Sequence, residues 1–164
     1  MSLVLIEKRI ISSTTASPIT FTGPWSGYSD LEIYGNIYCN GTGAQAIKMQ
    51  VNGDTGTNYM NYWMESILGS SLNSSGESAT SSVWTTYTSN NNSSFPIAFR
   101  LRMFDINSTT FVKPFTSRFG GIVANEGTYN NVWKSTAAIS SISFLRTSES
   151  NILAGSSITV YGVK

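Results

Sequence analysis

The residue types that carry out most enzyme chemistry are scarce in this chain of 164 residues. It contains no histidine, and Cys39 is its single cysteine. Without histidine there is neither a Ser–His nor a Cys–His nucleophile pair, and no histidine-ligated metal site. A lone cysteine forms no intrachain disulfide, and we expect Cys39 to be buried and inert. The sequence therefore predicts no catalytic residue, no metal and no cofactor, and we expect a protein that is not an enzyme.

One enzymatic alternative stays open, a hydrolase that uses two carboxylates as a glycosidase does. Such an enzyme needs two acids facing each other across a cleft. The nine acidic residues of this chain are scattered along it, and their spacing does not show which of them meet in space.

The segment Asn52-Gly53-Asp54-Thr55-Gly56 has some features of a calcium-binding loop. An EF-hand loop also needs a bidentate glutamate near its end, and no glutamate occurs between Gly53 and Met60. A tight turn explains the segment better, because a carboxylate at Asp54 can accept a backbone N–H in an Asx turn. We therefore interpret Asn52, Gly53 and Asp54 as a structural turn.

The aromatic residues suggest a second kind of site. Aromatic rings can stack on sugar rings while Asn and Asp side chains bind the hydroxyl groups, but large aromatics also fill cores and oligomer interfaces. Trp25 follows Gly23-Pro24 on a predicted turn, and we expect it to be the most exposed aromatic residue. The candidate contacts for a glycan or a protein partner are Trp25, Trp84, Tyr87, Asn90, Asn91 and Asn92.

Charge and hydropathy narrow the possible partners. Charged residues make up 12% of the chain, against about 25% in an average soluble domain, and the ten basic residues are scattered. Salt-dependent phosphate binding needs clustered Lys and Arg, so we do not expect a nucleic-acid partner. No segment approaches the roughly 20 apolar residues of a membrane span, and the apolar start is too short for a signal peptide. We expect synthesis in the cytoplasm and no membrane association.

The elements that would position these residues are short strands. Runs rich in Ile, Val, Thr, Tyr and Phe alternate with Gly, Asn and Ser, and no helical periodicity is long enough to indicate a helix. Residues 69–82 and 89–94 are polar and are expected to be loops. The predicted strands cover residues 3–11, 17–22, 28–40, 46–51, 57–68, 83–87, 95–105, 110–119, 137–146 and 156–162.

Three local features refine this prediction. Asn52-Gly53 is a strong hairpin signal and should join the strands at 46–51 and 57–68. Gly35 inside a long strand indicates a bulge, and Pro114 indicates an edge position or a bulge.

About ten strands with turns every 8–15 residues and no crossover helices are typical of a sandwich or barrel. We predict a single all-β domain over residues 1–164, an antiparallel β-sandwich of jelly-roll type. An immunoglobulin-like sandwich is the alternative.

Five sequence segments together resemble a recurrent family of tailed-bacteriophage virion proteins, which are small all-β proteins associated with the head or the tail. They occur in the same order over nearly the whole chain, whereas residues 69–94 and 111–131 match no pattern of that family. The segments are ITFTG at 19–23, YSDL at 28–31, VNGDTGTNY at 51–59, WKSTAAISSI at 133–142 and GSSITVYG at 155–162.

The resemblance implies a non-enzymatic structural component of a phage virion. The first expectation is a capsid decoration or cement protein, or a fibre subunit, that contacts the major capsid protein or a fibre. Low charge and abundant aromatics suit an obligate interface, so a homo-oligomer is expected, most simply a homotrimer. The alternative is a tail-associated receptor-binding or carbohydrate-binding module whose partner is a glycan of the host surface.

Overall fold

The computed structural model describes residues 2–40, 46–67, 71–86, 96–121, 125–146 and 150–164, and every regular element in them is a β-strand. These residues include no helix that could cross a membrane. The strands are β1 (Leu3–Ile10), β2 (Ile19–Thr22), β3 (Asp30–Ile37), β4 (Cys39–Asn40), β5 (Ile47–Val51), β6 (Tyr59–Ile67), β7 (Ser71–Thr80), β8 (Val83–Trp84), β9 (Ile97–Met103), β10 (Lys113–Gly120), β11 (Glu126–Trp133), β12 (Ser141–Arg146), β13 (Asn151–Ile152) and β14 (Ser157–Val163).

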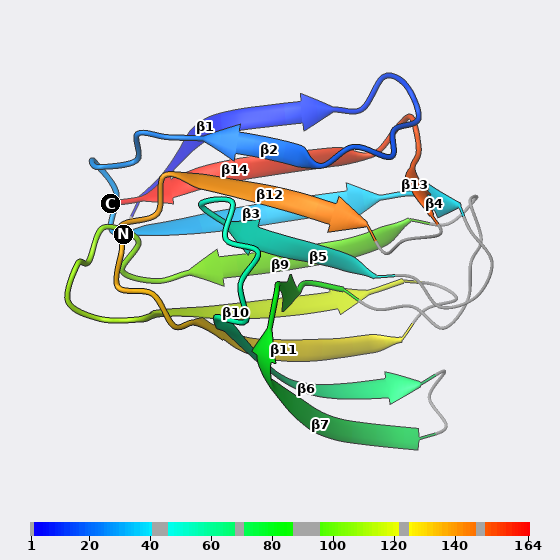
Figure 1. Ribbon diagram of the computed structural model, residues 1–164. Helices are drawn as coiled ribbons and strands as arrows, with labels where there is room; N and C mark the ends of the chain where they lie inside the picture. Colours follow the sequence, from blue (N-terminus) through cyan, green and yellow to red (C-terminus); the bar gives the residue numbers. More distant parts are fainter. Residues whose placement is uncertain (1, 41–45, 68–70, 87–95, 122–124, 147–149) are drawn as a thin grey trace.

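Two antiparallel sheets of unequal width form a sandwich. The large sheet has eight strands in the order β1-β14-β3-β9-β10-β11-β6-β7, and the small sheet has four in the order β2-β12-β5-β8. Figure 1 shows the small sheet lying across the large one, with the first and last strands side by side. The chain crosses repeatedly from one sheet to the other. The fold is therefore the predicted antiparallel β-sandwich of jelly-roll type.

The core lies between the two sheets and is built by period-two alternation. On β5 the side chains of Ile47, Met49 and Val51 are fully buried, and those between them are half-buried. The longer strand β9 shows the same alternation, with every second side chain buried. Rings from opposite sheets meet in the middle, where the centroids of Phe99 and Phe144 lie 5.7 Å apart. The alternation in the sequence thus predicted which face of each strand is buried.

The small sheet is too narrow to cover the large one. It ends at β8, which packs against β11 and β6, while the large sheet continues to β7 (Figure 1). Part of the inner face of the large sheet therefore emerges beyond β8. The described side chains of β7 are exposed, apart from that of Thr80.

The prediction of a loop at residues 69–82 is wrong, because β7 occupies most of that segment. It pairs with β6 along its whole length, from Tyr59 opposite Thr80 to Ile67 opposite Ser71. An edge strand exposed on both faces needs no apolar alternation, since backbone hydrogen bonds to its neighbour hold it. A second omission is β11, which was not predicted as a strand although it pairs with β10 and β6.

The turn at Asn52-Gly53 forms as predicted, but it does not make a hairpin. Both residues have positive φ, 52° and 66°, and the Asp54 N–H donates to the Val51 carbonyl at 2.9 Å. The strand before the turn belongs to the small sheet and the strand after it to the large sheet. The turn therefore carries the chain from one layer to the other.

Neither predicted irregularity of the large sheet is present. Gly35 pairs without a register shift with Ile158 on one side and Phe99 on the other. Its lack of a side chain instead leaves room for the Phe99 ring. Pro114 lies on an interior strand, one residue before the pairing of β10 with β9 begins at Phe115. Its missing N–H is tolerated there because β9 has no ladder partner for it.

Gly35 offers a direct test of this packing. A Cβ atom at Gly35 would lie 2.0 Å from Cε1 of Phe99. We expect Gly35→Ala to lower the free energy of unfolding by about 1–3 kcal/mol, because overpacking forces the ring or a strand to move. Chemical denaturation measures the change. Gly27→Ala is the matched control, because its Cβ would meet nothing within 4 Å. Equal effects of the two substitutions would contradict the interpretation.

Candidate functional site

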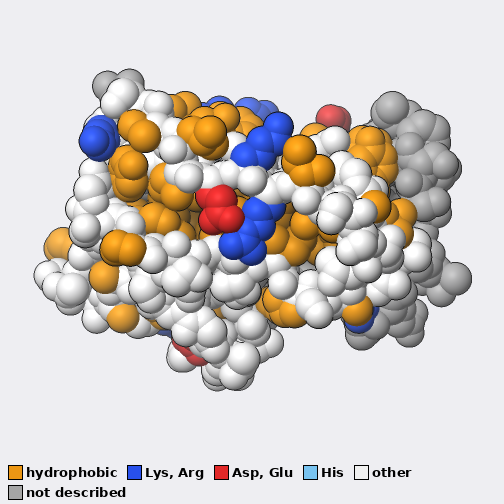
Figure 2. Space-filling view, turned by 90° about the horizontal axis from the view of Figure 1, so that it is seen from above, with side chains coloured by type: hydrophobic (Ala, Val, Ile, Leu, Met, Phe, Trp, Pro, Cys, Tyr) orange, Lys and Arg blue, Asp and Glu red, His pale blue; other side chains and the backbone are white. Residues whose placement is uncertain are grey.

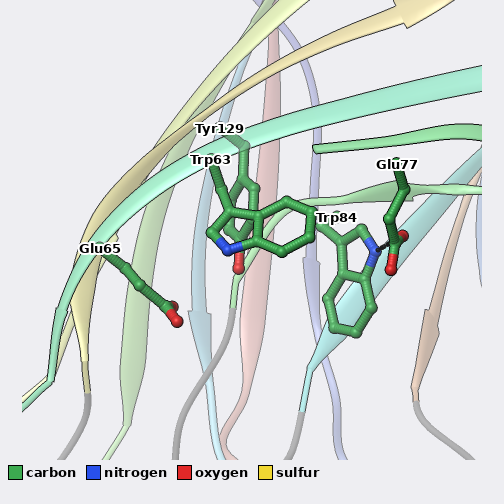
Figure 3. A pocket seen from close by; sticks show the side chains of 5 residues that line it. All are labelled: Trp63, Glu65, Glu77, Trp84 and Tyr129. Carbon is green, nitrogen blue, oxygen red and sulfur yellow. Dashed lines mark hydrogen bonds between the residues drawn. The ribbon is translucent and has the colours of Figure 1, made fainter. Parts of the chain in front are cut away.

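A cavity of about 220 Å³ opens where the inner face of the large sheet emerges beyond β8. Its lining comes from four strands, as Figure 3 shows: Trp63 and Glu65 from β6, Glu77 from β7, Trp84 from β8 and Tyr129 from β11. Three of the five residues are aromatic and two are acidic. A concave opening with a few convergent polar groups is the usual form of a small-ligand site.

A repeated pattern in two strands places the aromatic residues. The sequence Tyr-x-Asn-x-Trp occurs at 59–63 on β6 and again at 129–133 on β11. Residues two apart on a strand share one face, so each pattern presents Tyr, Asn and Trp inward. Antiparallel pairing sets Trp63 opposite Tyr129, Asn61 opposite Asn131, and Tyr59 opposite Trp133. Each end of the pair of patterns therefore holds one Tyr and one Trp.

The central asparagines fix β8 over this face. The Trp84 N–H donates to Oδ1 of Asn61 at 3.0 Å, and Nδ2 of Asn131 donates to the Trp84 carbonyl at 2.9 Å. One residue further, the Ser117 hydroxyl donates to the Thr85 carbonyl at 2.7 Å. These side chains provide hydrogen-bond partners for backbone groups of residues 84 and 85 that the short ladder with β5 does not pair. They also fix the position of Trp84 relative to the other rings of the cavity.

The rings of the cavity are supported by their neighbours. The centroids of Trp63 and Tyr129 lie 6.4 Å apart, and Tyr129 stacks on Phe119 at 5.1 Å. The Lys48 ammonium lies 4.2 Å from the centroid of Trp84. Since each ring is in contact with at least one other group, little ordering is needed when a ligand arrives.

A carboxylate lies at each end of the aromatic group (Figure 3). Glu77 accepts the indole N–H of Trp84 at 3.2 Å, which fixes both side chains. Glu65 is mostly buried and accepts a long hydrogen bond of 3.4 Å from Nδ2 of Asn125. The cavity therefore combines apolar ring faces with acceptors for hydroxyl or amine donors at both ends.

The other end of the paired patterns is closed. Nε1 of Trp133 donates to Asp54 at 2.7 Å, and the Tyr59 hydroxyl donates to the Asp54 carbonyl at 3.0 Å. The hydrogen bonds from Trp133, Asn58 and the Gly56 N–H hold the pKa of Asp54 below its usual value. Burial raises the pKa of Tyr59 to about 12. The Asp54 turn thus fills this end, as a structural element.

The predicted contact residues lie in different environments. Trp84 lines the cavity. The expectation that Trp25 is exposed is wrong, because its side chain is 3% exposed and belongs to the core. Its turn folds inward: the Trp25 carbonyl accepts the Tyr28 N–H and Nδ2 of Asn107. The other four candidates lie outside the described residues: Tyr87, Asn90, Asn91 and Asn92.

Four of the five residues that line the cavity are not among the candidates predicted from the sequence: Trp63, Glu65, Glu77 and Tyr129. The repeated Tyr-x-Asn-x-Trp pattern was the available signal, but it predicts a shared site only when the two strands are known to pair. The buried state of Cys39 is confirmed, and burial raises the pKa of its thiol to about 11. Within the described ranges, no cluster of three or more acidic or cysteine side chains could hold a metal ion.

Comparisons with known proteins give a likeness in solved structures only. No protein-family model matches the chain, and no curated protein matches it. A galectin from Caenorhabditis elegans, LEC-6, is 7% identical, with 93% of this chain and 94% of the galectin covered and a TM-score of 0.38. A legume lectin-like domain from Entamoeba histolytica is 8% identical, with 99% and 90% covered and a TM-score of 0.19. Both TM-scores are too low to indicate a shared family or a shared ligand.

The asparagine contacts with β8 can be tested by substitution. In Asn131→Leu the Trp84 carbonyl loses its side-chain donor. We expect the free energy of unfolding to fall by about 1–3 kcal/mol, the cost of an unsatisfied buried group. Backbone amides of residues 83–86 should also exchange with solvent faster in hydrogen-exchange measurements.

Asn130→Leu is the matched control, because Asn130 is the next residue on β11 and is exposed. Its effect on stability should stay within about 0.5 kcal/mol. Unchanged exchange at residues 83–86 in Asn131→Leu would show that β8 does not depend on this contact.

Proposed function

We propose that the protein is a non-enzymatic binding module that holds a saccharide in the cavity between Trp63, Trp84 and Tyr129. The supporting observation is the arrangement of three aromatic rings with a carboxylate at each end. The C–H faces of a sugar ring are apolar and pack on aromatic rings, while its hydroxyl groups donate to carboxylate oxygens.

The size and rigidity of the cavity support a small ligand. Its volume of about 220 Å³ lies below the usual range for drug-sized ligands, so it would hold one or two sugar units of a longer glycan. Trp84 is fixed through its backbone by Asn61 and Asn131 and through its indole by Glu77. Preorganised rings lose little conformational entropy on binding, which favours affinity.

The placement of the two acids supports binding in preference to cleavage. Glu77 pairs across the ladder with Asn61, four residues from Glu65 on β6. At a rise of about 3.3 Å per residue, their backbone positions differ by about 13 Å along the strand. A glycosidase needs the bond that it cleaves directly between two carboxyl groups, whereas in this cavity the space between the two acids is occupied by aromatic side chains. The carboxylates also lie on opposite sides of the rings in Figure 3.

The edge strand β1 favours a second candidate, a structural role in a phage virion. Its exposed hydrophobic residues are Leu3, Leu5 and Ile10, which are 48%, 57% and 66% exposed. Figure 2 looks down on the side of the sandwich formed by β1 and β2 and shows hydrophobic side chains gathered there. Apolar side chains beside a free strand edge suit a contact between chains. A homotrimer, or contacts with a capsid or fibre protein, would bury them.

The two proposals are compatible, because the cavity and β1 lie at opposite edges of the large sheet. A subunit assembled through β1 would leave the cavity open to a host-surface glycan. A receptor-binding or decoration subunit of a phage particle would combine both roles.

A glycan array followed by calorimetric titration of the best saccharide tests the binding proposal. Trp84→Ala should weaken its affinity at least tenfold, because a stacking surface is lost. Glu65→Gln and Glu77→Gln should weaken it less, since an amide oxygen still accepts a hydrogen bond. Phe111→Ala is the control, an exposed aromatic that does not line the cavity. The proposal would be abandoned if no glycan bound, or if Trp84→Ala bound as tightly as the wild type.

Sedimentation velocity at micromolar concentration tests assembly through β1. We expect an oligomer that Leu5→Glu dissociates at least tenfold more readily, because the substitution puts a charge into an apolar contact. Lys8→Glu is the control for a change of charge on the same strand, where Lys8 is exposed. A wild-type protein that sediments as a monomer would argue against a self-assembling subunit. Labelled antibody on purified particles, viewed by electron microscopy, would then decide whether the protein is part of a virion.

A further inference from the structure

Three arginines gather on the outer face of the large sheet. Arg100 on β9 and Arg118 on β10 are directly opposite each other in the ladder, and Arg102 follows two residues after Arg100. The neighbours Leu101 and Ser117 are fully buried on the inner face, so the arginines point outward. Two like charges directly opposite on paired strands lower the stability of a sheet.

Two of the three arginines are neutralised by acids from β3. Arg100 forms an ion pair with Glu32, and Arg102 contacts Asp30 at 2.8 Å. Arg118 is exposed, and among the described residues no carboxylate forms an ion pair with it. The group therefore keeps one uncompensated positive charge, located on Arg118.

The arginines surround a concavity. Arg100, Arg102 and Arg118 line a cavity of about 240 Å³ together with Phe104 and Thr116. The guanidinium of Arg102 lies over the Phe104 ring, with its central carbon 4.9 Å from the ring centroid. Thr116 pairs with Arg102 across the ladder and adds a hydroxyl group. Donors from two strands thus converge on one hollow that contains no acidic side chain.

We propose that this cavity binds an oxyanion, the carboxylate, sulfate or phosphate group of a ligand, with Arg118 as its main contact. A guanidinium presents a planar fork of N–H donors that matches two oxygens of such a group. A bound anion would also remove the repulsion between Arg100 and Arg118. The site lies on the opposite face of the sheet from the aromatic cavity and does not rest on the saccharide proposal.

Titration of ¹⁵N-labelled protein tests the site. Acetate, sulfate and phosphate are added separately at constant ionic strength, with chloride as the balancing salt, and the Nε–Hε signals of the arginines are followed. At least one oxyanion should shift the Arg100 and Arg118 signals along one saturable curve. The anion that binds most tightly identifies the ligand group.

Arg118→Gln should weaken the affinity at least tenfold, and Arg118→Lys should have an intermediate effect because it keeps the charge but loses the fork. Arg118→Gln is also expected to melt at the same temperature as the wild type or higher, since it relieves repulsion. Arg146→Gln makes the same change of charge on the small sheet and should bind as the wild type does. Shifts that do not saturate, or an affinity unchanged in Arg118→Gln, would overturn the proposal.

Discussion

Two asparagine side chains hydrogen-bond the backbone N–H and carbonyl of one residue, Trp84, and the edge of the small sheet depends on these contacts. Asn61 accepts the N–H and Asn131 donates to the carbonyl. The strand β8 contains only two residues and pairs with β5 alone, so its ladder is too short to hold it. The two asparagines supply the hydrogen bonds that this ladder does not provide, and such buried bonds are strong in the low local dielectric. The same contact determines where the small sheet ends and where the cavity opens.

The paired Tyr-x-Asn-x-Trp patterns show how one arrangement serves two purposes. At each end of the two paired patterns, a Tyr on one strand lies opposite a Trp on the other, on the inner face of the sheet. At one end Asp54 accepts hydrogen bonds from the Trp133 indole N–H and the Tyr59 hydroxyl. Both side chains are almost completely buried there. At the other end no turn of the described residues covers the rings, and Trp63 stays half-buried. The end that the chain itself fills is structural, and the open end is available to a ligand.

The sequence was a good guide where information is local and a poor one where it depends on distant partners. Alternation on β5 and β9 predicted the strands and their buried faces, and hence the sandwich. Asn52-Gly53 correctly predicted a turn, but turn chemistry does not say which sheet the next strand joins. The strand β7 has no apolar pattern, because it is held by the ladder with β6. Trp25 is buried by contacts with residues as distant as Asn107, which no local pattern reveals.

Binding residues were sought mainly in loops, where many proteins carry them. In this chain ordered strands are exposed on both faces of the large sheet: the narrower small sheet leaves part of the inner face open, and the outer face points away from the small sheet. On the inner face, β6 and β11 emerge beyond β8 and present aromatic rings. On the outer face nothing in the described chain covers β9 and β10, and they present arginines. Side chains on paired strands are held more precisely than those on loops, which suits recognition of a rigid ligand. The unequal width of the two sheets therefore opens the aromatic cavity, whereas the arginine cavity lies on the face of the large sheet that points away from the small one.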